Sequence, residues 1–233
     1  MNAVPVAGIL PRMARFPDTQ WSLIRATGEN PTARHAAFSE LARQYRPAIV
    51  AFFRARVSAA DAEDATQSFL AASFEHRWWA RADAQVGSFR AFLLMLLHRH
   101  GSRLRHAHDT ADPLDATFDP PDGAPEIDRQ FDARFALLLT TRALEALRTR
   151  YRERGREALF VELARLLGSP PAQGQLQETA AALGLVPNTL TVELKRLRSR
   201  LHDALREELR QLCASEAAFE TEWSALQAVL RGS

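Results

Sequence analysis

Apolar residues recur at three- and four-residue steps wherever this sequence is regular, and that spacing limits what the chain can fold into. Such steps place side chains on one face of an α-helix, whereas a half-buried strand needs alternation with a period of two. No convincing period-two run bounded by turn residues is present. We therefore predict an all-α fold.

The same pattern places four helices in the first half of the chain. Asn30 and Pro31 begin the second of them. Pro47 lies inside it, so we expect a kink or a break there. Ser58 and Asp61 form a capping-box pattern that opens the third helix. The first helix is expected over residues 18–27, with Asp18 or Thr19 as its N-cap, and the fourth over most of residues 87–107.

The composition changes abruptly at residues 109–128. This stretch holds seven acids, no basic residue and four prolines, which is typical of an extended linker that cannot build a core. We therefore predict two small helical domains, over residues 19–108 and 129–214. Residues 1–18 would form a tail. The amphipathic segment 215–233 would either pack onto the core of the second domain or bind a regulator.

Charge and cysteine content narrow the partners and the compartment. The 30 basic residues nearly balance the 28 acidic ones, so the positions of the charges indicate partners better than their sum does. Cys213 is the only cysteine, which excludes an intramolecular disulfide and a site with several thiolate ligands. The N-terminus has no pattern typical of a signal peptide, and the most apolar run, residues 89–97, has about half the length of a membrane span. We expect a cytoplasmic protein outside the membrane.

Patterns typical of catalysis or metal binding are weak. Four histidines follow Phe89, but no acid lies among them and no cysteine is near, so we do not predict a metal site. Asp, Ser and His residues occur without a nucleophile elbow, a phosphate-binding loop or an HExxH motif. We predict neither an enzyme nor a bound cofactor. The histidines are His98, His100, His106 and His108.

The stretch QETAAALGLVPNTLTVELKRLRSRL is the most informative motif. A short helix ends near Ala182, Gly184 relaxes the turn and Pro187 opens a second helix, which is the helix-turn-helix arrangement. Such a second helix can place side chains in the major groove of DNA while nearby cations neutralise phosphates. The alternative is a solvated basic face on an ordinary helical hairpin. The buried stripe would be Leu190, Leu194, Leu197 and Leu201, and the exposed or flanking residues Thr191, Lys195, Arg196, Arg198 and Arg200.

A second stretch, residues 77–108, mixes aromatic and basic residues. Aromatic faces can receive unstacked bases while arginines follow the backbone, which is how single strands are captured. The alternative is a helical core with a basic rim. The residues concerned are Trp78, Trp79, Arg81, Phe89, Arg90, Arg99, Arg103 and Arg105.

Acidic residues gather at the start of the third predicted helix. The run DAEDATQSF packs three carboxylates into four residues. Asp61, Asp64 and Ser68 lie at i, i+3 and i+7, so they would share one exposed face, which Glu63 flanks. Asp61 could also be only the capping partner of Ser58, because acids favour a helix N-terminus in any case. Both readings can hold together.

Taken in order, these motifs resemble a bacterial extracytoplasmic-function sigma factor, a two-domain specificity subunit of RNA polymerase. The resemblance covers about residues 19–214 and rests on QWSLI, DAEDATQSFL, GSFRAFLLMLL and the helix-turn-helix stretch, together with the acidic linker. The chain is most similar to a branch with a tryptophan-containing first helix, an AEDxTQ-like third helix and a GxFRxFL fourth helix. That branch also carries an ALF segment, which stands here at residues 158–160.

The resemblance implies partners and contacts for each region. The third helix would dock on the basic clamp helices of the largest subunit of core RNA polymerase through Asp61, Glu63, Asp64 and Ser68. The linker would thread the polymerase channel, where its acids mimic nucleic acid. The promoter DNA minus-ten element would be melted and held by Arg81, Gln85, Phe89, Arg90, Arg99 and Arg103. The minus-thirty-five element would be bound by Thr191, Val192, Lys195, Arg196, Arg198 and Arg200.

Two residues depart from the pattern of that family. Val186 stands where a serine or threonine often caps the recognition helix, and the missing cap would cost about 1 kcal/mol. Ser68 stands where a second acid is common. A phosphate on Ser68, or on Thr66 nearby, would add a charge of about −1.5 to −2 to the docking face. A Ser/Thr kinase or an anti-sigma protein would then be the regulator; alternatively, Ser68 is a neutral substitution and the acids suffice.

Two other functions remain open at this point. A one-component repressor would sense a ligand with residues 1–108 and bind an operator through the C-terminal domain, which normally requires a dimer and an apolar pocket. A degenerate sigma-like decoy would bind polymerase without opening promoters.

Overall fold

The computed structural model describes residues 20–82, 87–105, 124–168 and 174–232. Within these ranges the chain is all-α, as the periodicity predicts, and its one β-bridge joins Ser88 to Cys213. The predicted caps Asp18 and Thr19 lie outside the described residues. The elements are α1 (Gln20–Ala26), α2 (Pro31–Arg54), α3 (Ala59–Glu75), the 3-10 turn η1 (Trp79–Arg81), α4 (Phe89–Arg105), α5 (Ala124–Glu153), α6 (Glu157–Arg165), α7 (Gln175–Ala182), α8 (Pro187–Arg210) and α9 (Glu216–Arg231).

The start of each early helix follows from its capping residue. Asn30 precedes α2 and its side chain accepts a hydrogen bond from the Ala33 N–H at 3.0 Å, while Ser58 does the same for Asp61 at the start of α3. A break at Pro47 does not occur, because α2 runs through it to Arg54. The proline lies on the exposed face of the helix, where water can hydrogen-bond the carbonyl that lost its N–H partner.

The larger hydrophobic core lies among α1 to α4, the first half of α5, the last part of α8, and α9. Its largest fully buried side chains include Trp78, Trp79, Tyr45 and Phe52, together with Phe131 from α5 and Phe219 from α9. Burial of a side chain of this size stabilises the fold by roughly 2 to 3 kcal/mol. The smaller core joins the second half of α5 to α6, α7 and the first half of α8, around Leu163, Leu190 and Leu197.

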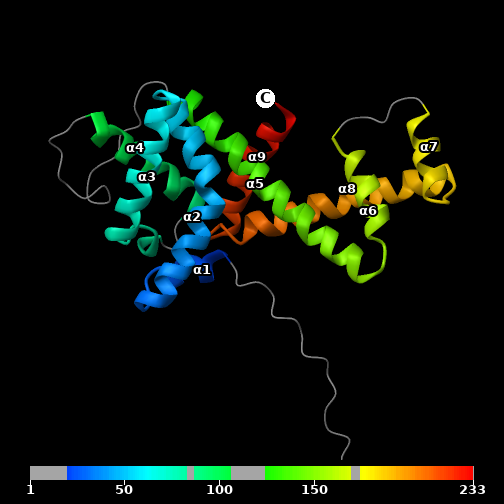
Figure 1. The fold of residues 1–233 in the computed structure, drawn as a ribbon, viewed down its shortest axis with the longest axis horizontal. Coiled ribbons are helices and arrows are strands. Elements are labelled where there is room, and N and C mark those ends of the chain that lie inside the picture. The colour runs from blue at the N-terminus through cyan, green and yellow to red at the C-terminus, as the bar shows by residue number, and fades with distance from the viewer. Residues whose placement is uncertain (1–19, 83–86, 106–123, 169–173, 233) are drawn as a thin grey trace, which may run out of the picture.

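Two long helices connect these cores. Figure 1 shows α1 to α4 at one end of the molecule and α6 and α7 at the other, with α5 and α8 running between them. α5 contributes Phe135 and Leu139 to the larger core and Leu147 and Tyr151 to the smaller one. Leu201 of α8 packs against both. The two ends are therefore tied by continuous helix and not only by a linker.

The predicted division of the chain needs correction in three places. Residues 124–128, expected in the linker, are the first turn of α5. The first half of α5 and the last part of α8 belong to the larger core, although the sequence groups 129–214 as a separate domain. The segment after residue 215 does pack on a core, but on the larger one, through Phe219, Trp223 and Leu226. The remaining linker residues, 109–123, lie outside the described ranges.

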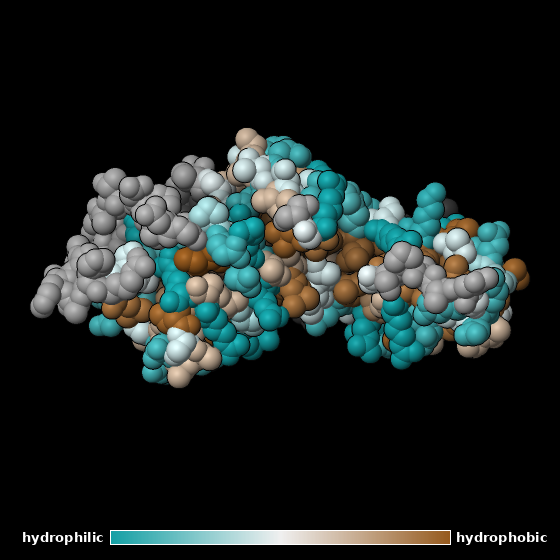
Figure 2. All heavy atoms as spheres, turned by 90° about the horizontal axis from the view of Figure 1, so that it is seen from above, coloured by the Kyte–Doolittle hydropathy of each residue, from teal (hydrophilic) through white to brown (hydrophobic). Residues whose placement is uncertain are grey.

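The surface of the described residues is mostly hydrophilic, with hydrophobic atoms gathered near the middle of the molecule (Figure 2). Leu137 of α5 is 53% exposed and Leu230 of α9 is 49% exposed.

Within the described ranges, none of the helices combines the length and the apolar character that crossing a membrane requires.

Candidate nucleic-acid interface

The turn between α7 and α8 has the closed geometry that a helix-turn-helix needs. Gly184 adopts a left-handed φ of 65°, which costs glycine little because it has no Cβ. The Leu185 N–H donates to the Ala180 carbonyl at 2.8 Å and the Gly184 N–H to the Ala181 carbonyl at 3.1 Å. These two bonds form a Schellman motif that fixes the direction in which α8 leaves the turn.

The buried stripe of α8 lies where the leucine spacing predicts. Leu190 and Leu197 are fully buried and Leu194 is 3% exposed, whereas Leu201 is only half-buried. They pack against Ala180 of α7 and neighbouring residues of the smaller core. Val186, at the N-cap, makes no side-chain capping bond, so the missing cap is confirmed.

The opposite face of α8 carries four of the six residues predicted to contact DNA. Thr191, Val192, Lys195 and Arg196 are all exposed. The Arg196 guanidinium donates to Glu193 at 3.0 Å, and the Thr191 hydroxyl donates to the Pro187 carbonyl at 3.1 Å. The structure thus brings these side chains together on one solvent-facing surface.

Arg198 and Arg200 have contacts within the fold that the sequence did not indicate. Arg198 donates to the Leu166 carbonyl at 3.3 Å. Arg200 donates to the Tyr151 hydroxyl at 2.9 Å, and its guanidinium carbon lies 5.7 Å from the centre of the Tyr151 ring. Both arginines therefore also hold α8 against neighbouring segments of the fold, and their predicted contact with DNA stays a prediction.

Sequence analysis missed an arginine-rich segment at the end of α5. Five arginines fall at every second position from 148 to 156. Arg148 pairs with Glu157 at 2.8 Å, and Arg156 pairs with Glu193 of α8 at 3.5 Å. The alternation of arginine with other residues was the available signal, but it resembles an ordinary solvated helix end.

The acidic face of α3 has the predicted geometry. Asp61, Asp64 and Ser68 are all exposed. Asp61 also serves the cap, because the Ser58 hydroxyl donates to its carboxylate at 2.7 Å while the Asp61 N–H donates to Ser58 at 3.3 Å. Asp61 therefore caps α3 and also lies on the same exposed face as Asp64 and Ser68, so both predictions are confirmed.

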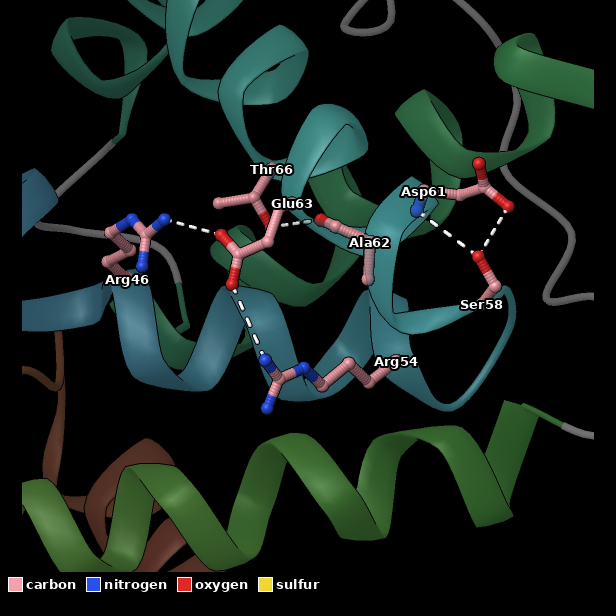
Figure 3. Close-up of polar contacts among 7 residues, drawn as sticks. All are labelled: Arg46, Arg54, Ser58, Asp61, Ala62, Glu63 and Thr66. Atoms are coloured by element: carbon pink, nitrogen blue, oxygen red, sulfur yellow. Dashed lines mark hydrogen bonds and ion pairs between the residues drawn. The ribbon is translucent and has the colours of Figure 1, made fainter.

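Glu63 and Thr66 point elsewhere. Figure 3 shows the Glu63 carboxylate between two arginines of α2, Arg46 at 2.5 Å and Arg54 at 3.5 Å. Its charge is therefore already partly neutralised. Thr66 is fully buried and its hydroxyl donates to the Ala62 carbonyl at 2.8 Å. Thr66 as a phosphorylation site is wrong for this conformation, since a kinase cannot reach a buried hydroxyl.

The aromatic residues predicted near the minus-ten motif are in the core. Phe89 is 0% exposed and its ring centre lies 5.2 Å from that of Tyr45 and 6.1 Å from that of Trp79. Trp78 and Trp79 are 1% and 0% exposed. These rings form the larger core and cannot stack on bases in this conformation, so the core-with-basic-rim alternative is correct for them.

Arg90 is held in a buried charged cluster with α5 and α9. Its guanidinium pairs with Glu222 at 2.9 Å and with Asp132 at 3.5 Å, and its side chain is 18% exposed. The Ser88 hydroxyl donates to the other oxygen of Glu222 at 2.6 Å. Burial, opposed by Arg90, raises the pKa of Asp132 to about 6. The prediction that Arg90 is free to contact DNA is therefore corrected.

The backbone on either side of this cluster is paired as well. The Phe89 N–H donates to the Leu212 carbonyl at 2.9 Å, and the Ala214 N–H donates to the Gly87 carbonyl at 2.9 Å. Residues 87–89 and 212–214 thus lie side by side although more than a hundred positions separate them. The segment leading into α9 covers the GSFR motif.

The remaining predicted minus-ten residues have different surroundings. Arg81 is exposed in η1, whereas Arg99 and Arg103 of α4 are half-buried. Gln85 lies outside the described residues. The structure does not bring these side chains onto one exposed surface with Phe89 and Arg90.

The histidines of α4 are part of the fold. His98 lies between Arg56 and Asp128. Its Nδ1 is 2.7 Å from a guanidinium nitrogen of Arg56, and its Nε2 is 2.6 Å from a carboxylate oxygen of Asp128. Burial and the charge of Arg103 lower the pKa of His100 to about 4. No group of three or more potential metal ligands occurs among the residues that the structure describes, and His106 and His108 lie outside them.

Comparison of the chain with protein-family models, with curated proteins and with solved structures finds no match in any of the three.

Proposed function

We propose that this protein is an alternative sigma factor that binds core RNA polymerase and directs promoter recognition. The observation that carries the proposal is the helix-turn-helix, in which Thr191, Val192, Lys195 and Arg196 share the exposed face of α8. An exposed polar and basic face on the second helix of such a motif suits a major groove. In this proposal α8 binds the minus-thirty-five element.

The proposed polymerase contact is the exposed face of α3. Asp61 and Asp64 would meet the basic clamp helices of the largest subunit, and complementary charge of this kind accelerates association and fixes the orientation of docking. Glu63 contributes less than the other two, because Arg46 and Arg54 already pair with it.

The proposed minus-ten contact needs a conformational step. Arg90 can reach DNA only after residues 212–214 and α9 move away from the GSFR motif, and Phe89 must in addition leave its contacts with Tyr45 and Trp79. Arg81, Arg99 and Arg103 would contact phosphates of the same element. A phosphate on Ser68, which is exposed, would add charge to the polymerase contact, with a Ser/Thr kinase as the enzyme and an anti-sigma protein as a second possible regulator.

The polymerase contact is tested by the affinity of the full chain for core RNA polymerase at low salt. Asp64→Lys should weaken binding at least tenfold, whereas the matched variant Asp203→Lys, at an exposed acid of α8 with its side chain 74% exposed, should not. Ser68→Glu should strengthen binding and Ser39→Glu on α2 should not. Equal affinity of wild type, Asp64→Lys and Ser68→Glu would contradict the proposed docking face.

The same preparation addresses the two other functions. A repressor would be dimeric and would bind a palindromic duplex tightly without polymerase, whereas the proposed sigma factor binds duplex DNA weakly until polymerase is added. A decoy would bind polymerase and yield no transcripts. Two grooves formed by described residues, of about 600 and 780 Å³, each carry several charged side chains, whereas a pocket for an apolar ligand is lined mostly by apolar side chains.

A further inference from the structure

The end of α5 and the turn that follows it, residues 150–156 and hereafter the turn, present three cations near the recognition helix. Arg150, Arg152 and Arg154 are exposed, and none of them makes an ion pair with any residue in the described part of the chain. Glu153 is the one acid among them, so three positive charges against one negative leave a surplus of two. Within the described residues, this group therefore carries a net positive charge that no ion pair offsets.

The backbone of this turn is fixed. Gly155 adopts a left-handed φ of 67°. The Arg156 N–H donates to the Tyr151 carbonyl at 2.8 Å, and the Gly155 N–H donates to the Arg152 carbonyl at 2.9 Å. This Schellman closure ends α5 at a defined angle. The arginines therefore extend from a rigid support and lose less freedom on binding than they would in a flexible loop.

A shared carboxylate sets this turn beside the DNA-facing side of α8. Glu193, with its side chain 7% exposed, pairs with Arg156 of the turn at 3.5 Å and with Arg196 of α8 at 3.0 Å. Tyr151, one turn earlier on α5, is in contact with Arg200. The turn therefore lies beside the side of α8 that carries Arg196 and Arg200. On the other side of α8, Arg198 donates a hydrogen bond to the Leu166 carbonyl.

We propose that Arg150, Arg152 and Arg154 bind the phosphate backbone of duplex DNA along one edge of the groove that α8 occupies. The inference rests on the proposed function only in that α8 faces DNA. A helix in the major groove has a phosphate backbone on each side, so a basic element on its flank meets phosphates and not bases. This contact would orient α8 in the groove and add affinity for DNA of any sequence.

The test measures binding of the full chain to a labelled duplex of arbitrary sequence, between about 50 and 200 mM salt. Replacing all three arginines by glutamine should lower the salt slope of log K by about 2 to 3, because each phosphate contact contributes about 0.9. Replacing them by lysine should leave the slope unchanged. Arg156 stays in place because it pairs with Glu193, and unfolding curves of the variants should match that of wild type.

The matched control replaces Arg25, Arg54 and Arg77 by glutamine. These arginines are exposed on α1, α2 and the turn after α3, at the far end of the molecule from α7 (Figure 1). The control removes the same net charge, and its slope should stay near that of wild type. Equal slopes for the two triple variants would overturn the inference, as would a wild-type chain that does not bind the duplex at the lowest salt.

These outcomes are separate from those of the proposed function. If Lys195→Ala weakens binding but the triple glutamine variant does not, α8 binds DNA without the turn. If the slope changes as expected but no polymerase-dependent transcription occurs, the turn binds DNA in a protein that is not a sigma factor.

Discussion

The sequence predicts promoter contacts in two regions, and the structure gives those regions opposite environments. On α8, Thr191 and Lys195 face solvent on a helix whose buried side is filled by its own leucine stripe. At residues 87–90, Phe89 is fully buried and Arg90 is paired with two acids. In the proposed function the first region contacts DNA in the conformation described, whereas the second must first separate from α9. This difference can be tested residue by residue.

The largest expected effect is on stability, at Phe89. Phe89→Ala should lower the free energy of unfolding by about 3 to 5 kcal/mol, because it removes a fully buried ring from the larger core. Val192→Ala, at a side chain 40% exposed on α8, should change it by less than about 0.5 kcal/mol. Urea unfolding measures both. A Phe89→Ala protein as stable as wild type would remove the contrast between the regions.

The buried cluster around Arg90 should make stability depend on pH. Burial raises the pKa of Asp132 from 3.8 to about 6 against the lowering effect of Arg90, and Asp128 and Glu222 add to the rise. The folded state therefore binds this proton more tightly than the unfolded chain, so the stability it adds below pH 4 is lost as pH rises through about 6. Relative to Asp132→Asn, wild type should lose at most about 3 kcal/mol between these values. If the free energies of unfolding of wild type and Asp132→Asn changed with pH in parallel, the raised pKa of Asp132 would be contradicted.

Removal of one carboxylate should loosen the cover over the GSFR motif. Glu222→Gln takes the charge from the closest partner of Arg90 and should cost about 2 kcal/mol, since a buried charge loses part of its compensation. Amide hydrogen exchange in α9 and residues 212–214 should accelerate. Glu220→Gln is the matched control, because that carboxylate is 56% exposed and lies 3.5 Å from Arg206. Equal exchange in the two variants would show that the cluster does not hold α9.

The smallest expected effect sharpens the account of the helix-turn-helix. Val186→Ser should raise stability by about 1 kcal/mol, because Val186 is the N-cap of α8, is 66% exposed and makes no capping bond. Thermal unfolding of the two proteins measures the gain. A lower melting temperature for Val186→Ser would mean that packing of the valine stabilises the fold more than a serine cap would.

Local patterns in the sequence predict local structure well in this chain. The Ser58 cap, the leucine stripe of α8 and the turn at Gly184 each depend on residues within a few positions of one another, and each is confirmed. The environment of Arg90 depends on Asp132 and Glu222, which lie far along the chain. No spacing rule connects such positions, so the burial of the GSFR motif could not be predicted.

The domain boundary was misplaced for a similar reason. The acidic stretch after residue 108 does mark a change in composition, but composition does not show that α5 and α8 are long enough to enter both cores. At about 1.5 Å per residue, the 30 residues of α5 extend about 45 Å. The apolar residues of one amphipathic helix can therefore serve two cores, and the periodicity is the same in either case.

Run-off transcription tests the central claim most directly. Purified core RNA polymerase would be combined with the full, unmodified chain and fragmented genomic DNA, with core polymerase alone and the Ser68→Glu variant in parallel. The account predicts discrete transcripts that core polymerase alone does not produce and that the Lys195→Ala, Arg196→Ala double variant greatly reduces. No discrete transcripts with either wild type or Ser68→Glu, from preparations that do bind core polymerase, would contradict it.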